Sequence, residues 1–224
     1  MSERIELRRK PERSVTDQGA IHAALDEGLI AHVGLIAGEG DSAHPVVIPM
    51  LYARDGDRLY LHGSPASRLL RTAKKGADVC ATITLLDALV LARSGLHHSM
   101  NYRSVVIMGT ATEVTDPDEK LAALDRLVDH SIPGRVSAIR APREAEVKAT
   151  TVLLLPLDEC SMKERAGPPV DDEEDMVEEA WAGLIPLGVA VGTPVPDKDS
   201  VDDPVPAHVS GWIRGSALAI GRGD

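Results

Sequence analysis

The residue pair Ser67 and Arg68 carries side chains suited to binding a phosphate. The pair follows Ser64-Pro65-Ala66, at the predicted start of a short helix. A helix start presents unpaired backbone N–H groups and the positive end of a dipole. Ser67 adds a hydroxyl donor, and Arg68 adds a guanidinium that can bind phosphate through two parallel hydrogen bonds. From this segment alone, an ordinary basic surface helix is the simpler interpretation, and a phosphate site is the minority one.

A second group of polar side chains stands directly before a strongly apolar predicted strand: His97, His98, Asn101, Tyr102 and Arg103. In a loop at the edge of a barrel, such side chains can hydrogen-bond a heterocycle or a phosphate. Histidine is also a metal ligand, but adjacent histidines rarely chelate one ion, and no Cys or Glu lies at metal spacing nearby. The sequence therefore predicts no zinc or iron site.

A predicted β-hairpin positions the first group. Two apolar runs, residues 46–53 and 58–63, are joined through Arg54-Asp55-Gly56-Asp57. Asp-Gly between apolar runs is a strong hairpin signal, because Gly accepts a positive φ without steric cost. The hairpin leads into the short helix that opens near Ser67.

Further strands are predicted at residues 31–37, 78–86, 88–94 and 104–114, with a last core strand after residue 150. Helices are predicted from Thr16 to Gly28 and over residues 115–134, each with a capping residue at its start. Most connections are short, and strands do not alternate regularly with crossover helices. The pattern predicts a mainly β protein, an antiparallel barrel of six to seven strands with flanking helices, and disfavours a doubly wound parallel sheet.

Composition excludes several classes of function. The net charge of −11 argues against broad nucleic-acid binding, which needs a basic surface, and the aromatic content of 2% leaves few side chains on which bases could stack. No stretch reaches the roughly 18 apolar residues that a membrane span requires. The N-terminus lacks the apolar region of a signal peptide. We therefore expect a cytoplasmic protein whose Cys80 and Cys160 form no structural disulfide.

Two stretches, taken in order, carry a resemblance to a known family. They are HPVVIPMLYARDGDRLYLHGSPASRLLR at residues 44–71 and HHSMNYRSVVIMGTA at residues 97–111, with support from ITLLDALVLARS, PPVDDEED and WAGLIPL. The chain resembles the pyridoxamine 5′-phosphate oxidase-like superfamily of FMN-binding split barrels, and within it the branch related to nitroimidazole-resistance proteins. We accordingly expect a split-barrel domain over residues 1–187 and a Pro- and Asp-rich extension over residues 188–224.

The resemblance implies a homodimer with FMN in a groove between the two barrels. The first hairpin strand would run along the isoalloxazine, the second would end beside it, and the helix start would hold the phosphate. The loop before the long strand and a C-terminal tryptophan would complete the site. The implied cofactor-binding residues are Val47, Ile48, Pro49, Met50, His62, Gly63, Ser67, Arg68, Asn101, Tyr102, Arg103, Ser104 and Trp181.

The chain departs from the oxidases that act on pyridoxamine phosphate. It has Val47 and Tyr52 where those enzymes carry basic residues, and it lacks their Arg-containing C-terminal substrate motif. We expect an FMN-dependent oxidoreductase of the flavin reductase or nitroreductase type that acts on a small molecule. The alternatives are a non-catalytic FMN-binding protein, or a related barrel that binds deazaflavin, or haem through His62, His97 or His98. The sequence assigns no catalytic side chain, substrate or electron donor.

Overall fold

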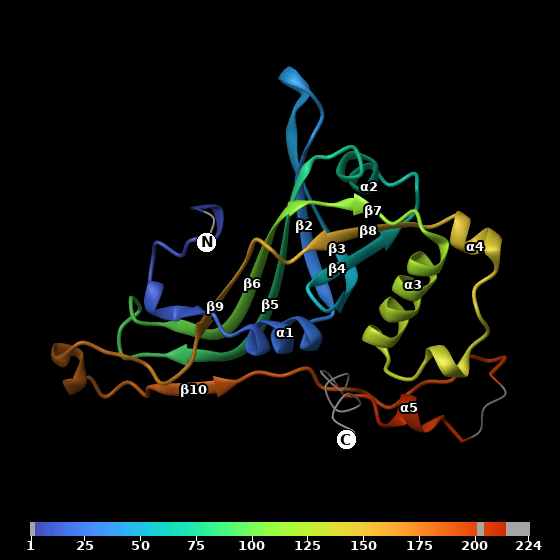
Figure 1. The fold of residues 1–224 in the computed structure, drawn as a ribbon. Helices are drawn as coiled ribbons and strands as arrows, with labels where there is room; N and C mark the ends of the chain where they lie inside the picture. Colours follow the sequence, from blue (N-terminus) through green and yellow to red (C-terminus); the bar gives the residue numbers. More distant parts are fainter. Residues whose placement is uncertain (1–2, 201–203, 214–224) are drawn as a thin grey trace.

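The computed structural model describes residues 3–200 and 204–213, which fold around one antiparallel sheet (Figure 1). The strand order is β1-β9-β6-β5-β2-β3-β4-β8-β7, and β10 pairs with β5. The strands are β1 (Ser14–Val15), β2 (Ile30–Ala37), β3 (His44–Asp55), β4 (Arg58–Gly63), β5 (Asp78–Leu91), β6 (Ser99–Thr110), β7 (Thr112–Glu113), β8 (Thr151–Pro156), β9 (Cys160–Arg165) and β10 (Gly183–Pro186). The predicted class, a mainly β antiparallel barrel with outer helices, is confirmed. The described residues form ten strands rather than the predicted six to seven, because short strands such as β1, β7 and β10 add to the sheet.

The helices lie outside the sheet. They are α1 (Gln18–Glu27), α2 (Arg68–Ala73), α3 (Pro117–Ser131), α4 (Glu144–Lys148) and α5 (Ala207–Ser210), with 3-10 turns η1 (Glu3–Ile5), η2 (Pro11–Arg13), η3 (Gly40–Ser42), η4 (Val136–Ala138) and η5 (Glu173–Val177). α3 packs against β3, β4 and β8. Asp116 caps α3 by accepting hydrogen bonds from the backbone N–H groups of Asp118 and Glu119, which supports the predicted start of this helix. Among the described residues, none of the helices is both long and apolar enough to cross a bilayer.

The predicted hairpin forms as expected, but the strands that follow it have other boundaries than the sequence predicts. β3 and β4 meet at Gly56, which has a φ of 57°, the left-handed conformation that favours glycine. The two strands predicted at residues 78–86 and 88–94 form one long strand, β5, because Asp87 is accommodated as a bulge opposite β6. The single last core strand is a hairpin, β8 and β9.

Aliphatic side chains fill the core, as the absence of Phe from the sequence requires. The main cluster lies inside the barrel and is built from every second residue of the central strands, among them Val33, Ile83, Ile107 and Leu155. Tyr52 is fully buried there and donates its hydroxyl to the carbonyl oxygen of Leu25. Cys80 and Cys160 are both free thiols, as expected.

Two parts of the sheet project beyond the barrel (Figure 1). The β2–β3 hairpin stands out at one end with η3 at its tip, and the far ends of β5 and β6 form an arm along which β10 pairs with β5. Further along the chain, the indole N–H of Trp212 donates to the carbonyl oxygen of Ser131 at 2.8 Å, which ties the C-terminal segment to the end of α3. Part of the predicted extension at 188–224 lies outside the described residues.

Candidate cofactor sites

A cavity of about 670 Å³ lies between the hairpin strands and the layer formed by α3, η4 and α4. Its walls are mostly aliphatic: Leu51, Leu121, Leu124, Leu127, Val128, Val136 and Ile139. His62 contributes an imidazole from β4, on the same strand face as Tyr60, which packs in the small cluster beneath α3. The cavity therefore combines a large apolar wall with one titratable nitrogen heterocycle.

The imidazole of His62 lacks the partners expected of a buried polar group. Its Nδ1 atom is buried and has no hydrogen-bond partner among the described residues. Burial lowers the pKa of His62 below the ordinary value of 6.5, so the ring is neutral at pH 7. A buried unpaired polar atom costs free energy unless a ligand or a water molecule completes it.

The charged groups of this cavity lie near α4. Arg140 binds Glu146 through two hydrogen bonds of 2.8 and 2.6 Å, and this pairing lowers the pKa of Glu146 to about 2. Both side chains line the cavity. Sequence reasoning missed the residues of this pocket outside His62, although apolar positions along residues 121–128 marked an amphipathic helix, because nothing in the sequence places α4 beside it.

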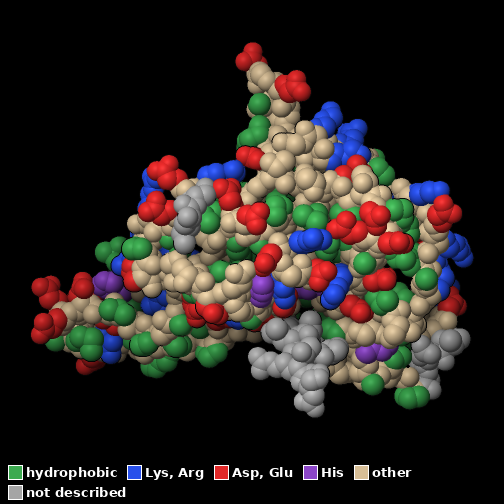
Figure 2. All heavy atoms as spheres, viewed as in Figure 1, with side chains coloured by type: hydrophobic (Ala, Val, Ile, Leu, Met, Phe, Trp, Pro, Cys, Tyr) green, Lys and Arg blue, Asp and Glu red, His purple; other side chains and the backbone are tan. Residues whose placement is uncertain are grey.

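The predicted phosphate pair lies on a separate surface, at α2. Ser67 is the N-cap residue of this helix, and its hydroxyl accepts a long hydrogen bond of 3.4 Å from the backbone N–H of Leu70. Arg68 is exposed and forms no ion pair within residues 3–200 and 204–213. Gly63 lets the helix approach β4 closely, because a Cβ atom there would meet Leu70 at 2.9 Å. Figure 2 shows Lys and Arg side chains gathered over α2.

The four predicted residues of β3 divide between the two faces of the sheet. Val47 and Pro49 are exposed and lie opposite Gly34 and His32 of β2, on the outer face. Met50 packs against the core cluster on the inner face, while Ile48 is 43% exposed. Alternation along the strand therefore leaves two of the four side chains on the outer surface with His32, a residue that sequence reasoning did not single out.

The predicted residues Asn101 to Ser104 lie in a strand rather than in a loop, because β6 begins at Ser99. Their side chains therefore alternate between the two faces of the sheet, as those of β3 do. Tyr102 and Ser104 lie on the outer face, where Ser104 is 3.3 Å from the hydroxyl of Thr84. Asn101 is buried and donates to the carbonyl oxygen of Gly167 at 3.1 Å.

Arg103 points away from that outer face and joins two carboxylates. Its guanidinium donates to Glu27 of α1 at 2.6 and 3.1 Å, and to Asp87 of β5 at 2.7 and 3.1 Å. The hydrogen bonds that Arg103 donates, to Asp87 first and to Glu27 second, raise the pKa of its guanidinium further above the ordinary value. The guanidinium thus forms four hydrogen bonds to carboxylates of its own chain, and a direct role in cofactor binding stays a prediction.

The remaining predicted residues lie on the projecting arm. Trp181 is 67% exposed, and its indole covers Gly183 at the start of β10. His97 faces the acidic run after residue 170, where its nitrogens are 3.4 Å from Asp175 and 3.6 Å from Asp172. That run is held to the sheet, because Asp171 accepts two hydrogen bonds from Arg93 at 2.7 and 2.9 Å. His62 and His97 therefore belong to different surfaces.

The antiparallel barrel, with helices outside it and long paired strands projecting from it, defines the split-barrel class of flavoprotein folds. The chain belongs to the pyridoxamine 5′-phosphate oxidase family, whose sequence profile matches residues 17–164. No curated protein matches the chain.

Two solved structures are similar over nearly the whole chain. The flavocytochrome Anf3 from Azotobacter vinelandii is 38% identical, with a TM-score of 0.86 over 95% of this chain and 97% of that chain. An FAD- and haem-binding protein from Mycobacterium smegmatis is 36% identical, with a TM-score of 0.82 over 89% and 96%. A candidate 5-nitroimidazole antibiotic resistance protein from Bacteroides thetaiotaomicron shares the fold at 23% identity, with a TM-score of 0.56 over 67% and 85%.

Proposed function

We propose that this protein is a redox protein of the flavocytochrome type that binds FAD and one haem. The observation that carries the haem assignment is the neutral, unpaired imidazole of His62 in an apolar cavity of about 670 Å³. The relatives at 38% and 36% identity support the same pair of cofactors, since one is described as a flavocytochrome and the other as an FAD- and haem-binding protein. These descriptions favour FAD over the FMN expected from the sequence.

The cavity suits a haem in three respects. Imidazole is a common axial ligand of haem iron, and a ligand nitrogen must be unprotonated, which the lowered pKa of His62 favours. The aliphatic side chains of α3 and η4 match the apolar faces of the macrocycle and exclude water. Arg140 supplies a cation beside the cavity that can pair with a carboxylate group of the ligand.

The flavin site that we propose lies on the outer face of the sheet and at α2. Val47 and Pro49 offer an apolar surface to the ring, while Ser67 and Arg68 offer a hydroxyl and a guanidinium to a phosphate. When bound, the flavin supplies hydride and electron chemistry and the haem supplies one-electron chemistry. The protein's own residues bind, orient and shield the two groups.

We further propose that two copies of the chain associate through this outer face. It carries exposed apolar side chains, among them Ile36 at 58%, Val47 at 61% and Leu86 at 39%. Apolar surface that is contiguous and exposed marks an interaction site in soluble proteins. A second copy of the same face would cover these side chains and enclose the flavin between the two barrels.

The haem assignment is tested by the spectrum of the purified protein after reconstitution with haemin. We expect a Soret band shifted from that of free haemin, with one haem per chain by the pyridine haemochrome assay. His62→Ala is expected to lose the band while it keeps the flavin. His22→Ala removes a half-buried imidazole that does not line the cavity, and is expected to keep both. Full haem binding by His62→Ala, or none by the unchanged protein, would contradict the proposal.

A further inference from the structure

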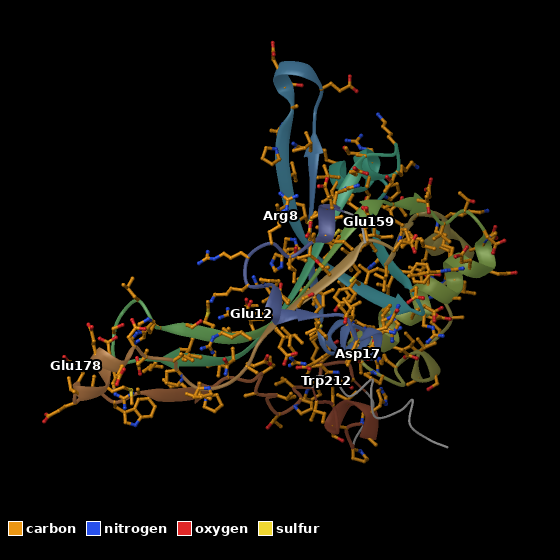
Figure 3. The ribbon with its side chains drawn as sticks, turned by 60° about the vertical axis from the view of Figure 1, so that its left-hand side comes forward. Arg8, Glu12, Asp17, Glu159, Glu178 and Trp212 are labelled. Carbon is orange, nitrogen blue, oxygen red and sulfur yellow. The ribbon has the colours of Figure 1, made fainter. Side chains whose placement is uncertain are left out.

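A second cavity of about 670 Å³ lies near the opposite end of the strand order from β3, β4 and β8, which α3 covers, between η2, β9 and the turn that leads into β6. The N-terminal segment between the labelled Arg8 and Glu12 in Figure 3 supplies part of its wall. Five cationic side chains line the cavity: Arg9, Lys10, Arg13, Lys163 and Arg165. Ser67 and Arg68 are not part of it, so it is distinct from the phosphate pair at α2.

The positive charge in this cavity is largely uncompensated. Within the described residues, Arg9, Arg13, Lys163 and Arg165 form no ion pair with a carboxylate, and Lys10 reaches Glu12 at 3.8 Å on the exposed surface. The polar contacts of these side chains are neutral instead. Lys163 donates to the carbonyl oxygen of Arg9 at 2.8 Å, and Arg165 donates to Asn101 and to the carbonyl oxygen of Pro168, the latter at 3.3 Å.

This arrangement is unusual for a chain with a net charge of −11, in which carboxylates are plentiful. Arg54, Arg93 and Arg103 each bind a carboxylate at 2.6 to 2.9 Å. In the cavity, one carboxylate from the described residues, that of Asp172, is present in the lining, and it lies 3.6 Å from His97. Clustered like charges repel one another, so a concave group of them is typical of a site that receives an anion.

The clustering of positive charges affects the pKa of Arg165. Burial first, and the nearby charge of Arg13 second, lower the pKa of its guanidinium below the ordinary value. Arg13 is held next to this position by the main chain, because β1 pairs with β9 and places Ser14 opposite Lys163. The like charges are therefore brought together by the sheet itself, and an anionic ligand would offset their repulsion.

We propose that this cavity binds the phosphate groups of a nucleotide. Guanidinium groups bind phosphate oxygens through paired hydrogen bonds and lysine adds a point charge, and here both kinds surround one concave space. Tyr102 and the exposed Leu96 also line the cavity, which provides aromatic and apolar surface for a base beside the charges. The phosphates belong either to the flavin dinucleotide of the proposed function or to a freely exchanging nucleotide.

The test is isothermal titration of the full chain with inorganic pyrophosphate, with ADP and with adenosine. We expect pyrophosphate and ADP to bind with an affinity that falls as salt rises, and adenosine to bind far more weakly. The double variant Arg13→Gln/Lys163→Gln is expected to weaken pyrophosphate binding by roughly tenfold or more, because charge-assisted hydrogen bonds are lost. Lys198→Gln is the control, since Lys198 is 85% exposed and lies outside the cavity.

The two sources of phosphate give different results. If the ligand exchanges freely, the flavin-loaded protein binds pyrophosphate, and the double variant keeps its flavin. If the phosphates are those of FAD, pyrophosphate binds after the flavin is stripped, and the double variant loses FAD affinity while it keeps FMN. The inference is overturned if neither form binds pyrophosphate, or if the double variant, folded by circular dichroism, binds it as the unchanged chain does. Pyrophosphate binding by a protein that takes up no flavin or haem would refute the proposed function and leave this site standing.

Discussion

His62 illustrates how a single residue acquires its environment from neighbours that are remote in the sequence. The family resemblance implies a position beside a flavin ring, which stays a prediction, and in the structure the imidazole lines the cavity beneath α3 and η4. Its Nδ1 atom is buried without a partner among the described residues, and burial lowers its pKa. The residue is thus poorly accommodated in the protein alone, which is the expected property of a ligand-binding group.

At this scale we predict that His62→Leu stabilises the cofactor-free protein by about 1 kcal/mol near neutral pH, because it removes an unpaired buried polar atom. The pH dependence of the free energy of unfolding should change as well. The folded pKa of His62 lies below 6.5, so the unfolded chain binds the proton first, and stability is lost as pH falls from 6.5 towards the folded pKa. The His62→Leu variant is expected to show no such loss of stability from this position.

Urea unfolding of both proteins between pH 5 and pH 8 measures the effect. His130 is present in both, and burial also lowers its pKa, so a residual loss of stability on acidification is expected in the variant. An equal dependence on pH in the two proteins, or a less stable variant at pH 7, would contradict the role of His62 as an unpaired group.

At the scale of elements, Arg103 joins α1 to the sheet. The guanidinium lies between Glu27 of α1 and Asp87, the bulge residue of β5, with its closest hydrogen bonds at 2.6 and 2.7 Å. The planar group gives two hydrogen bonds to each carboxylate, whereas a lysine has three N–H donors and cannot form all four. The bulge therefore has a structural consequence, since it turns the Asp87 carboxylate towards this ion pair.

We predict that Arg103→Met lowers the free energy of unfolding by about 1–3 kcal/mol, because two half-buried carboxylates lose their partner. Arg103→Lys should recover part of this loss. Flavin content per folded chain, measured after heat release, should stay unchanged in Arg103→Lys. Loss of flavin at unchanged stability would instead favour a direct role of Arg103 in cofactor binding.

At the scale of the whole molecule, the outer face of the sheet and the projecting arm expose apolar side chains that one chain cannot cover. Figure 2 shows hydrophobic side chains gathered along the arm that carries β10. Ile36 of β2 lies on the outer face near the end of the projecting hairpin, opposite Pro45. The β2–β3 hairpin and the arm extend past the barrel (Figure 1), so both are available to contact a second chain in the proposed association.

We predict that Ile36→Glu converts a dimer into a monomer and lowers flavin retention, because a charge at this position would be buried between two copies. Size-exclusion chromatography with light scattering measures the mass, and absorbance measures the flavin. Ala122→Glu, at an exposed position of α3, is the matched control and should remain dimeric. A monomeric unchanged protein would rule out the proposed association.

Local patterns along the chain were enough to predict most of the strands and helices and the class of fold. Asp-Gly at residues 55–56 specifies a hairpin, the apolar period of residues 117–131 specifies a helix, and the order of the motifs indicates the family. These features depend on neighbours a few residues apart, so they can be read from the chain. The chain alone does not show which side chains of β3 and β6 face outward, because the register between paired strands sets which residues share a face. The shift in register at Asp87 likewise arises where β5 pairs with β6.

The surroundings of the titratable groups likewise depend on how distant segments pack together. The cavity of His62 forms because α3 and α4 pack over β4. The basic cavity forms because η2 lies beside β9, and Lys163 donates a hydrogen bond to the carbonyl oxygen of Arg9, some 150 residues earlier in the chain. Burial and charge density depend on such contacts between distant segments, and neither is encoded in the spacing of residues along the chain.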